Sequence, residues 1–223
     1  GPAAEAARKA GVGAATAGGV VRWDLATGGS QVFDSSTGLA SQHVTALLIA
    51  SDGAVWAGTN AGLSRYDGSG WVTFTHEDGL PSDYVTMLIQ ASDGTLWSGT
   101  SAGLARHTNG AWETAWGPGS DATVTIDAAV ETEDGALWFA SGSAGLLRVE
   151  NTSADPERVT DGPSSPTHLV VDAEGLLWVA DLAGDLWRYD GSWMAMPQSG
   201  LSEPIVALAA GPGSTAPRPP LNT

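Results

Sequence analysis

Five arginines recur at corresponding places along the sequence, and a ring of such cations would attract an anionic ligand. They make up five of the nine basic residues: Arg22, Arg65, Arg106, Arg148 and Arg188. A guanidinium group can also stack on an aromatic ring or pair with a carboxylate. Because each arginine recurs together with the rest of a repeated motif, we interpret all five as structural. We expect each to stack on a neighbouring tryptophan or to pair with a turn aspartate, and so to hold adjacent repeats together.

Other residue types that carry chemistry are scattered. The four histidines, at positions 43, 76, 107 and 168, show no metal-ligand spacing. The Asp-Gly pairs lack the Asp-x-Asp-x-Asp-Gly run and closing glutamate of a calcium loop, and are instead typical of turns. Gly142-Ser143 does not form the Gly-x-Ser-x-Gly turn of a serine hydrolase, and glycine motifs for phosphates are absent. We predict no catalytic residue, cofactor or metal site, and hence no enzyme.

A repeat of about forty residues must position these side chains. Asp-Gly or Glu-Gly precedes each of four tryptophans, Trp56, Trp97, Trp138 and Trp178, which are separated by 41, 41 and 40 residues. A fixed period in this range indicates stacked units that share their cores.

Each repeat contains four short apolar segments separated by turns. In one unit they are residues 44–48, the segment around Trp56, residues 62–66 and the segment that begins at Trp71. Such units can close radially around an axis. We therefore predict an all-β fold, a five-bladed β-propeller with four-stranded antiparallel blades.

The two ends of the sequence complement one another. Residues 11–24 match the second and third segments of the next repeat, so the start supplies strands two, three and four of a blade. Residues 200–206 match the approach to a repeat, and residues 207–210 continue as its first strand. Their pairing would close the ring and remove two open sheet edges. Gly13 stands where other blades carry tryptophan, so we expect loose packing there, or Trp23 in the gap.

The repeat sets the domain bounds, and the charge and the apolar runs limit the possible partners. We predict a propeller over residues 11–211, an N-terminal arm over residues 1–10 and a proline-rich tail or linker over residues 212–223. Nine Lys+Arg against 25 Asp+Glu give a net charge of −16, which disfavours nucleic acid. The longest apolar runs are too short for a membrane span, so we predict no direct membrane insertion.

One part of the repeat carries a family resemblance. Asp78-Gly79-Leu80-Pro81-Ser82-Asp83-Tyr84-Val85, followed by residues 92–104, resembles the two-component regulator propeller repeat, and a second copy covers residues 38–63. The resemblance implies an extracytoplasmic sensor-type propeller of bacteria, located in the periplasm or at the cell surface. It implies tryptophans that pack between blades and no reaction.

Binding is expected where the repeat departs from itself, in the loops of one face. The loops between second and third strands and those that lead into first strands contribute the candidates Gln42, His43, Asn60, Asp83, Tyr84, Ser101, Trp116, Asp121, Thr123 and Ser143. Tyr84 and Trp116 are the expected aromatic anchors.

These observations favour a non-catalytic binding, sensing or protein-interaction module outside the cytoplasm. Its partner would be a protein, a glycan or a small ligand. One alternative is a structural subunit of a larger surface or membrane complex. A second alternative is a lyase resembling virginiamycin B lyase, which would require a metal and a histidine base on one loop face. Fold alone does not choose between these functions.

Overall fold

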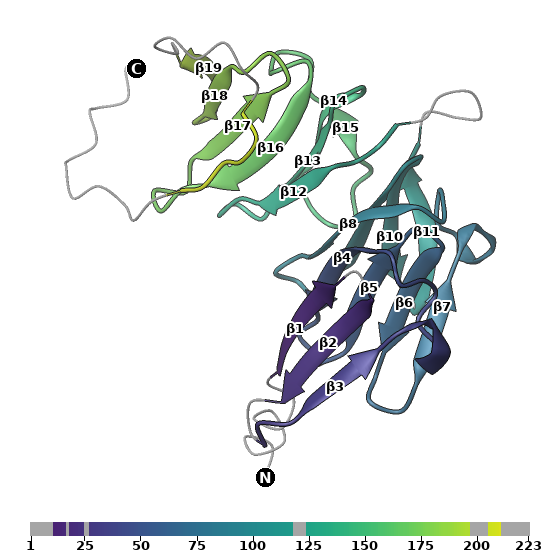
Figure 1. Ribbon diagram of the computed structural model, residues 1–223. Coiled ribbons are helices and arrows are strands. Elements are labelled where there is room, and N and C mark those ends of the chain that lie inside the picture. The colour runs from purple at the N-terminus through teal and green to yellow at the C-terminus, as the bar shows by residue number, and fades with distance from the viewer. Residues whose placement is uncertain (1–10, 17, 25–26, 118–123, 197–204, 211–223) are drawn as a thin grey trace.

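The chain folds into five antiparallel sheets that follow one another along the sequence (Figure 1). The structure is a computed structural model that describes residues 11–16, 18–24, 27–117, 124–196 and 205–210. The predicted arm and tail, residues 1–10 and 212–223, lie outside the described residues. The all-β prediction and the count of five sheets are confirmed.

Each sheet is a meander in which consecutive strands pair. Sheet 1 contains β1 (Gly11–Thr16), β2 (Gly19–Asp24) and β3 (Ser30–Phe33). Sheet 2 contains β4 (Val44–Ile49), β5 (Val55–Thr59), β6 (Gly62–Tyr66) and β7 (Trp71–Phe74). Sheet 3 contains β8 (Val85–Gln90), β9 (Leu96–Thr100), β10 (Gly103–Thr108) and β11 (Ala111–Trp116). Sheet 4 contains β12 (Ala128–Glu131), β13 (Leu137–Ser141), β14 (Gly145–Val149) and β15 (Glu157–Arg158). Sheet 5 contains β16 (Pro166–Val171), β17 (Leu177–Asp181), β18 (Leu186–Tyr189) and β19 (Trp193–Met196).

Repeated hydrogen bonds tie sheet 2 to sheet 3 and sheet 3 to sheet 4. The Thr45 hydroxyl donates to the Val85 carbonyl, and 41 residues later the Thr86 hydroxyl donates to the Ile126 carbonyl, both at 2.5 Å. At the other end of the strands, the backbone N–H of Ser92 donates to the Glu131 carboxylate at 2.8 Å. The first strands of sheets 2 to 5 consequently lie side by side.

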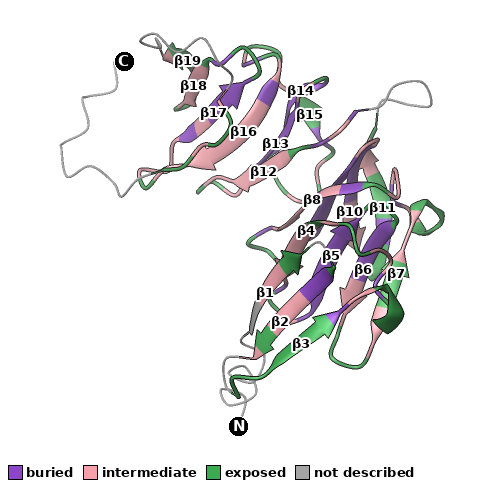
Figure 2. Cartoon of the chain, viewed as in Figure 1, coloured by how far each residue is buried: buried purple, intermediate pink, exposed green. Residues whose placement is uncertain are grey.

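The core lies between the sheets and along their second strands. All five residues of β5, β9 and β13 are buried. Figure 2 shows buried segments in purple within the sheets. Trp97 is fully buried and lies 5.4 Å from Phe139 of the next sheet, measured between ring centroids. Because a four-stranded sheet cannot bury both of its faces alone, these contacts between sheets supply the core.

Sheet 1 has the three strands that the sequence predicts. The space of the tryptophan that Gly13 replaces is filled by a different residue from the one expected. Trp23 is 41% exposed, so the expectation that it replaces the missing tryptophan is wrong. Phe33 packs there instead, with its ring centroid 4.6 Å from Tyr66 and 5.2 Å from Trp71. The reason is the pleat, because side chains alternate between the faces of a strand. Arg22 is the residue of β2 that pairs with Gly13, so the next residue, Trp23, lies on the opposite face.

Closure of the ring is not seen in the structure. Sheets 1 and 5 lie at opposite ends of the array (Figure 1), and β1 pairs with β2 alone among the described strands. Residues 205–210, where the closing strand was predicted, form no strand.

Replacing Trp97 by alanine tests the packing between sheets. The loss of a fully buried indole is expected to lower the free energy of unfolding by about 3–5 kcal/mol. Tyr84→Ala, at a position 47% exposed, serves as the control. It is expected to change this free energy by less than about 0.5 kcal/mol. Urea denaturation measures both, and equal losses would contradict the assigned role of Trp97.

Candidate binding face

The loops that lead into first strands meet the turns between second and third strands at one end of the sheets. The Asp83 carbonyl accepts a hydrogen bond from the backbone N–H of Gly62 in sheet 2, at 2.7 Å. The neighbouring Tyr84 carbonyl accepts one from the backbone N–H of Ser101 in sheet 3, at 2.9 Å. The Asp83-Tyr84 segment therefore bridges two sheets, and we call this end of the sheets the binding face.

Buried threonines hold the turn tips of this face. The Thr59 hydroxyl accepts from the N–H of Ala61 at 3.0 Å and donates to the Gly62 carbonyl at 2.8 Å. Thr100 makes the equivalent bonds in the next sheet. Asn60 and Ser101, which follow these threonines, are therefore presented by rigid turns.

A histidine that the sequence analysis did not select also lies here. His76 begins the short 3-10 helix η2 (His76–Asp78), whose N-cap is Thr75. The Asp83 carboxylate accepts from the His76 backbone N–H at 2.7 Å and lies 3.0 Å from His76 Nδ1. A repeat signal existed, because Ser35 and Gln42 stand 41 residues earlier at the equivalent places and form a hydrogen bond of 3.4 Å.

His76 and Asp83 each favour the charged form of the other. The Asp83 carboxylate, through its hydrogen bond and its charge, raises the pKa of His76 above the usual value. The backbone N–H of His76 is the main cause that lowers the pKa of Asp83. The His76 side chain is 63% exposed, so the pair is available to solvent and to a partner.

The structure brings most of the predicted binding residues to this face. Gln42, His43, Asn60, Asp83, Tyr84 and Ser101 come from sheets 2 and 3, and Ser143 from the corresponding turn of sheet 4. Trp116 ends β11 and is half-buried against the core between sheets 3 and 4. Asp121 and Thr123 lie outside the described residues. The role of these side chains in binding stays a prediction.

The repeated arginines contact the repeated tryptophans in three sheets. The guanidinium carbon lies 5.4–5.7 Å from the indole centroid in the pairs Arg65–Trp56, Arg106–Trp97 and Arg148–Trp138. Carboxylates add ion pairs, such as Arg106–Glu113 and Arg188–Asp190, both at 2.9 Å. Trp178 of the last sheet donates instead from its indole N–H to Asp172 at 2.7 Å.

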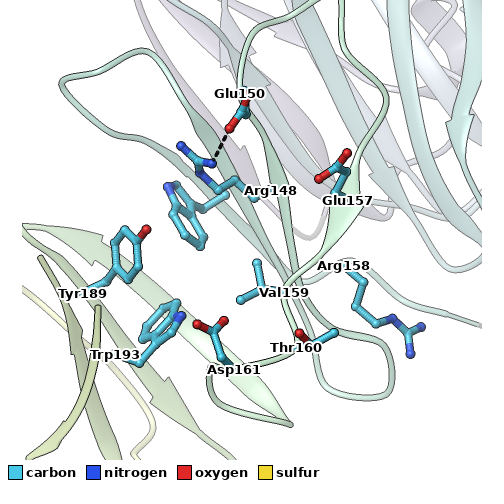
Figure 3. Close-up of a pocket in the computed structure, with 10 residues that line it drawn as sticks. Arg148, Glu150, Glu157, Arg158, Val159, Thr160, Asp161, Tyr189 and Trp193 are labelled. Carbon is cyan, nitrogen blue, oxygen red and sulfur yellow. Dashed lines mark hydrogen bonds and ion pairs between the residues drawn. The ribbon is translucent and has the colours of Figure 1, made fainter. Parts of the chain in front are cut away.

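A pocket of about 230 Å³ lies between sheets 4 and 5 (Figure 3). Figure 3 shows Tyr189 and Trp193 on one side and Glu157 and Arg158 on the other. Arg148 also lines it and donates to Glu150 at 2.9 Å. The pocket combines aromatic walls with charged groups, which suits a small polar ligand. The repeat pattern does not predict this pocket, although the absence of a fourth-segment tryptophan before Glu157 marks the irregular β15.

Two kinds of feature are absent from the described part of the chain. Within it, histidine, aspartate and glutamate side chains form no group of three placed to hold a metal ion. No helix in the same residues is long and apolar enough to cross a membrane.

Stacked four-stranded meanders with a repeated Trp–Arg contact define the propeller-repeat class of proteins. Within that class, the family model described as two component regulator propeller matches residues 38–61 and 79–102. These segments run from the loop before β4 to the turn after β5, and from the loop before β8 to the turn after β9. The chain therefore carries two-component regulator propeller repeats in sheets 2 and 3, as predicted.

Solved structures share this fold at low sequence identity. The extracellular domain of a putative one component system from B. thetaiotaomicron aligns with a TM-score of 0.69 and 18% identity, over 88% of this chain and 29% of its own. That of a putative hybrid two component system from the same organism aligns with a TM-score of 0.61 and 22% identity, over 79% and 24%. PorZ, a surface component of the type-IX secretion system of Porphyromonas gingivalis, gives 0.60 and 19%, over 80% and 30%. This chain thus spans less than a third of each of them, and no curated protein sequence matches it significantly.

The His76–Asp83 pair predicts a pH effect. Replacing Asp83 by asparagine is expected to lower the pKa of His76, measured by an NMR pH titration, because the main cause of its elevation is removed. The folded-state pKa of His76 lies above its unfolded value and that of Asp83 lies below its own, so the pair stabilises the fold while His76 is protonated and Asp83 is ionised. This effect is lost as the pH rises through the folded pKa of His76.

Glu77→Gln is the matched control for this titration. Its charge acts on His76 less strongly than Asp83 does, so this variant is expected to lower the His76 pKa by less. A His76 pKa that is the same in the wild type and in Asp83→Asn would contradict the assignment.

Proposed function

We propose that this chain is a non-catalytic binding or sensing module that works outside the cytoplasm. Its target on the binding face is a protein partner, a glycan or a small ligand. The observation that carries this proposal is that each repeat contains two kinds of residue, repeated packing residues and variable loop residues. The repeated tryptophans and arginines are engaged in packing, whereas the side chains that vary stand on rigid loops at one end.

Tyr84 is the centre of the proposed site. Its side chain is 47% exposed, although its backbone is held on both sides. The Tyr84 N–H donates to the Ser82 hydroxyl at 3.1 Å, and the Tyr84 carbonyl accepts from Ser101. A rigid, exposed tyrosine loses little conformational entropy on binding, and such residues are frequent binding hot spots.

Two observations support a place outside the cytoplasm. The matched repeats belong to a family whose resemblance already implied export. Solved structures with the same fold include extracellular domains. The net charge of −16 favours a partner without a dense negative charge.

The finer architecture within this proposal is a closed five-bladed ring. Trp56 and Trp138 contact the third-strand aromatic residues of the following sheets, His107 and Tyr189, at centroid distances of 5.8 and 5.0 Å. In a closed ring, sheet 1 would follow sheet 5. The second-strand Trp178 of sheet 5 would then contact the third-strand Trp23 of sheet 1, which is exposed.

The alternative of a structural subunit rests on two exposed features of sheet 1. An open β1 edge and an exposed Trp23 would suit packing against another part of a larger surface complex. The lyase alternative needs a metal and a histidine base on one loop face, and the described residues provide no group of metal ligands there.

A pull-down tests the binding face. The whole chain serves as bait against an envelope fraction, beside the variant Tyr84→Ser. A partner retained by the wild type and lost with Tyr84→Ser is expected, because the variant removes the central aromatic anchor. Val72→Ser, at a position 51% exposed on β7, is the matched control and should retain the partner. If all three baits retain the same proteins, the binding face is not the site. Glycan arrays with the same three proteins test the second target class.

A double-mutant cycle tests ring closure. If Trp23 and Trp178 are in contact, the alanine variants are expected to show a coupling of about 0.5–1.5 kcal/mol in the free energy of unfolding. Trp178→Ala combined with Tyr84→Ala is the control pair, and its effects should add. Additive effects for Trp23 and Trp178 would count against closure through this contact.

A further inference from the structure

The pocket in Figure 3 lies where the fourth strand of sheet 4 ends early. β15 contains only Glu157 and Arg158, and the chain then turns toward sheet 5. Gly162 lies directly against Trp193 of sheet 5, because a Cβ atom added to this glycine would meet the indole at 2.8 Å. Residues 157–161 and Trp193 therefore line one pocket of about 230 Å³.

Two aromatic side chains of sheet 5 form one wall of this pocket. Tyr189 and Trp193 pair across β18 and β19, and their ring centroids lie 4.9 Å apart with an angle of 45° between the ring planes. Both residues are half-buried and line the pocket. The face of an aromatic ring carries a negative partial charge and attracts a cation.

Glu157 and Asp161 bring two carboxylates to the same pocket. Among the residues that the structure describes, neither carboxylate has a hydrogen bond or an ion pair. Figure 3 shows the Asp161 carboxylate beside the Trp193 ring. A cation at this place would therefore meet an aromatic ring and a carboxylate together.

The two arginines that line the pocket leave this place open. Arg148 donates to Glu150 at 2.9 Å, and its guanidinium carbon lies over the Trp138 ring at 5.4 Å. The Arg158 guanidinium points away from the Trp193 ring in Figure 3. Three carboxylates against two guanidinium groups leave the lining with a net negative charge.

We propose that this pocket binds a small organic ammonium ion of the choline type, with its methylated nitrogen against Tyr189 and Trp193 and beside Asp161. A primary ammonium group needs acceptors for its three N–H donors, whereas a methylated one needs none and suits aromatic walls. The binding face is built around Asp83 and Tyr84 between sheets 2 and 3, so this site is separate from it. Either proposal can fail without the other.

Choline is the probe, and its uncharged analogue dimethylbutanol, in which a carbon atom replaces the nitrogen, is the matched control ligand. We expect choline to shift the NMR signals of residues 157–161 and of the Trp193 indole N–H on titration into the whole chain. The neutral alcohol is expected to bind about fivefold more weakly, because it lacks the attraction between the cation and the rings.

Two aspartate variants test the position of the charge. Asp161→Asn is expected to weaken choline binding by about threefold, because one facing carboxylate is lost. Asp155→Asn is the matched control, since Asp155 is exposed between β14 and β15 but does not line the pocket. It is expected to bind choline as the wild type does.

Tyr189→Leu tests the aromatic wall and is expected to weaken choline binding by about fivefold. If this variant does not fold, the comparison of the two aspartate variants still decides. No shift with choline, equal affinity for choline and the neutral alcohol, or equal affinity of the wild type and Asp161→Asn would each overturn the proposal.

Discussion

The packing of one sheet's indole against the next sheet is the contact on which the rest of this molecule depends. A single four-stranded sheet has two apolar faces and no means of covering either. Trp97 illustrates the solution: it is fully buried, Arg106 covers it within its own sheet, and Phe139 meets it from the next. The indole thereby fixes the distance between sheets, and the polar links at either end of the strands then find their partners.

The two ends of the sheets differ in how much their sequences vary. The turn between first and second strands is nearly the same in sheets 2 to 5, because tight turns with positive φ, here at Gly53, Gly94, Gly135 and Gly175, admit few residue types. The opposite end tolerates change, because its backbone is held by buried threonines such as Thr59 and Thr100, and the tips that follow are free to vary. Binding residues such as Tyr84 therefore have a rigid support that their own identity does not affect.

Two of the pockets between sheets occupy equivalent places in the repeat. One lies between sheets 1 and 2 and is lined by Arg22 and Tyr66. The other lies between sheets 4 and 5 and is lined by Arg148 and Tyr189, with Trp138 also in its wall. The pocket in Figure 3 instead borders the two-residue β15, which lacks a fourth-strand tryptophan. A large side chain missing from a repeated interface leaves space that its neighbours refill only in part.

The strands of sheets 1 to 5, their order and the repeat could be predicted from the sequence, because the turn residues and the spacing of about 41 residues act locally. The sequence located the loops of Asn60, Ser101 and Tyr84 at one end for the same reason, since strand direction alternates along a meander. Packing between sheets 1 and 2, which the sequence pattern does not show, places Phe33 in the gap of sheet 1 and leaves Trp23 exposed. Whether sheets 1 and 5 meet depends on the summed angles between sheets, to which every interface contributes and which no local pattern specifies.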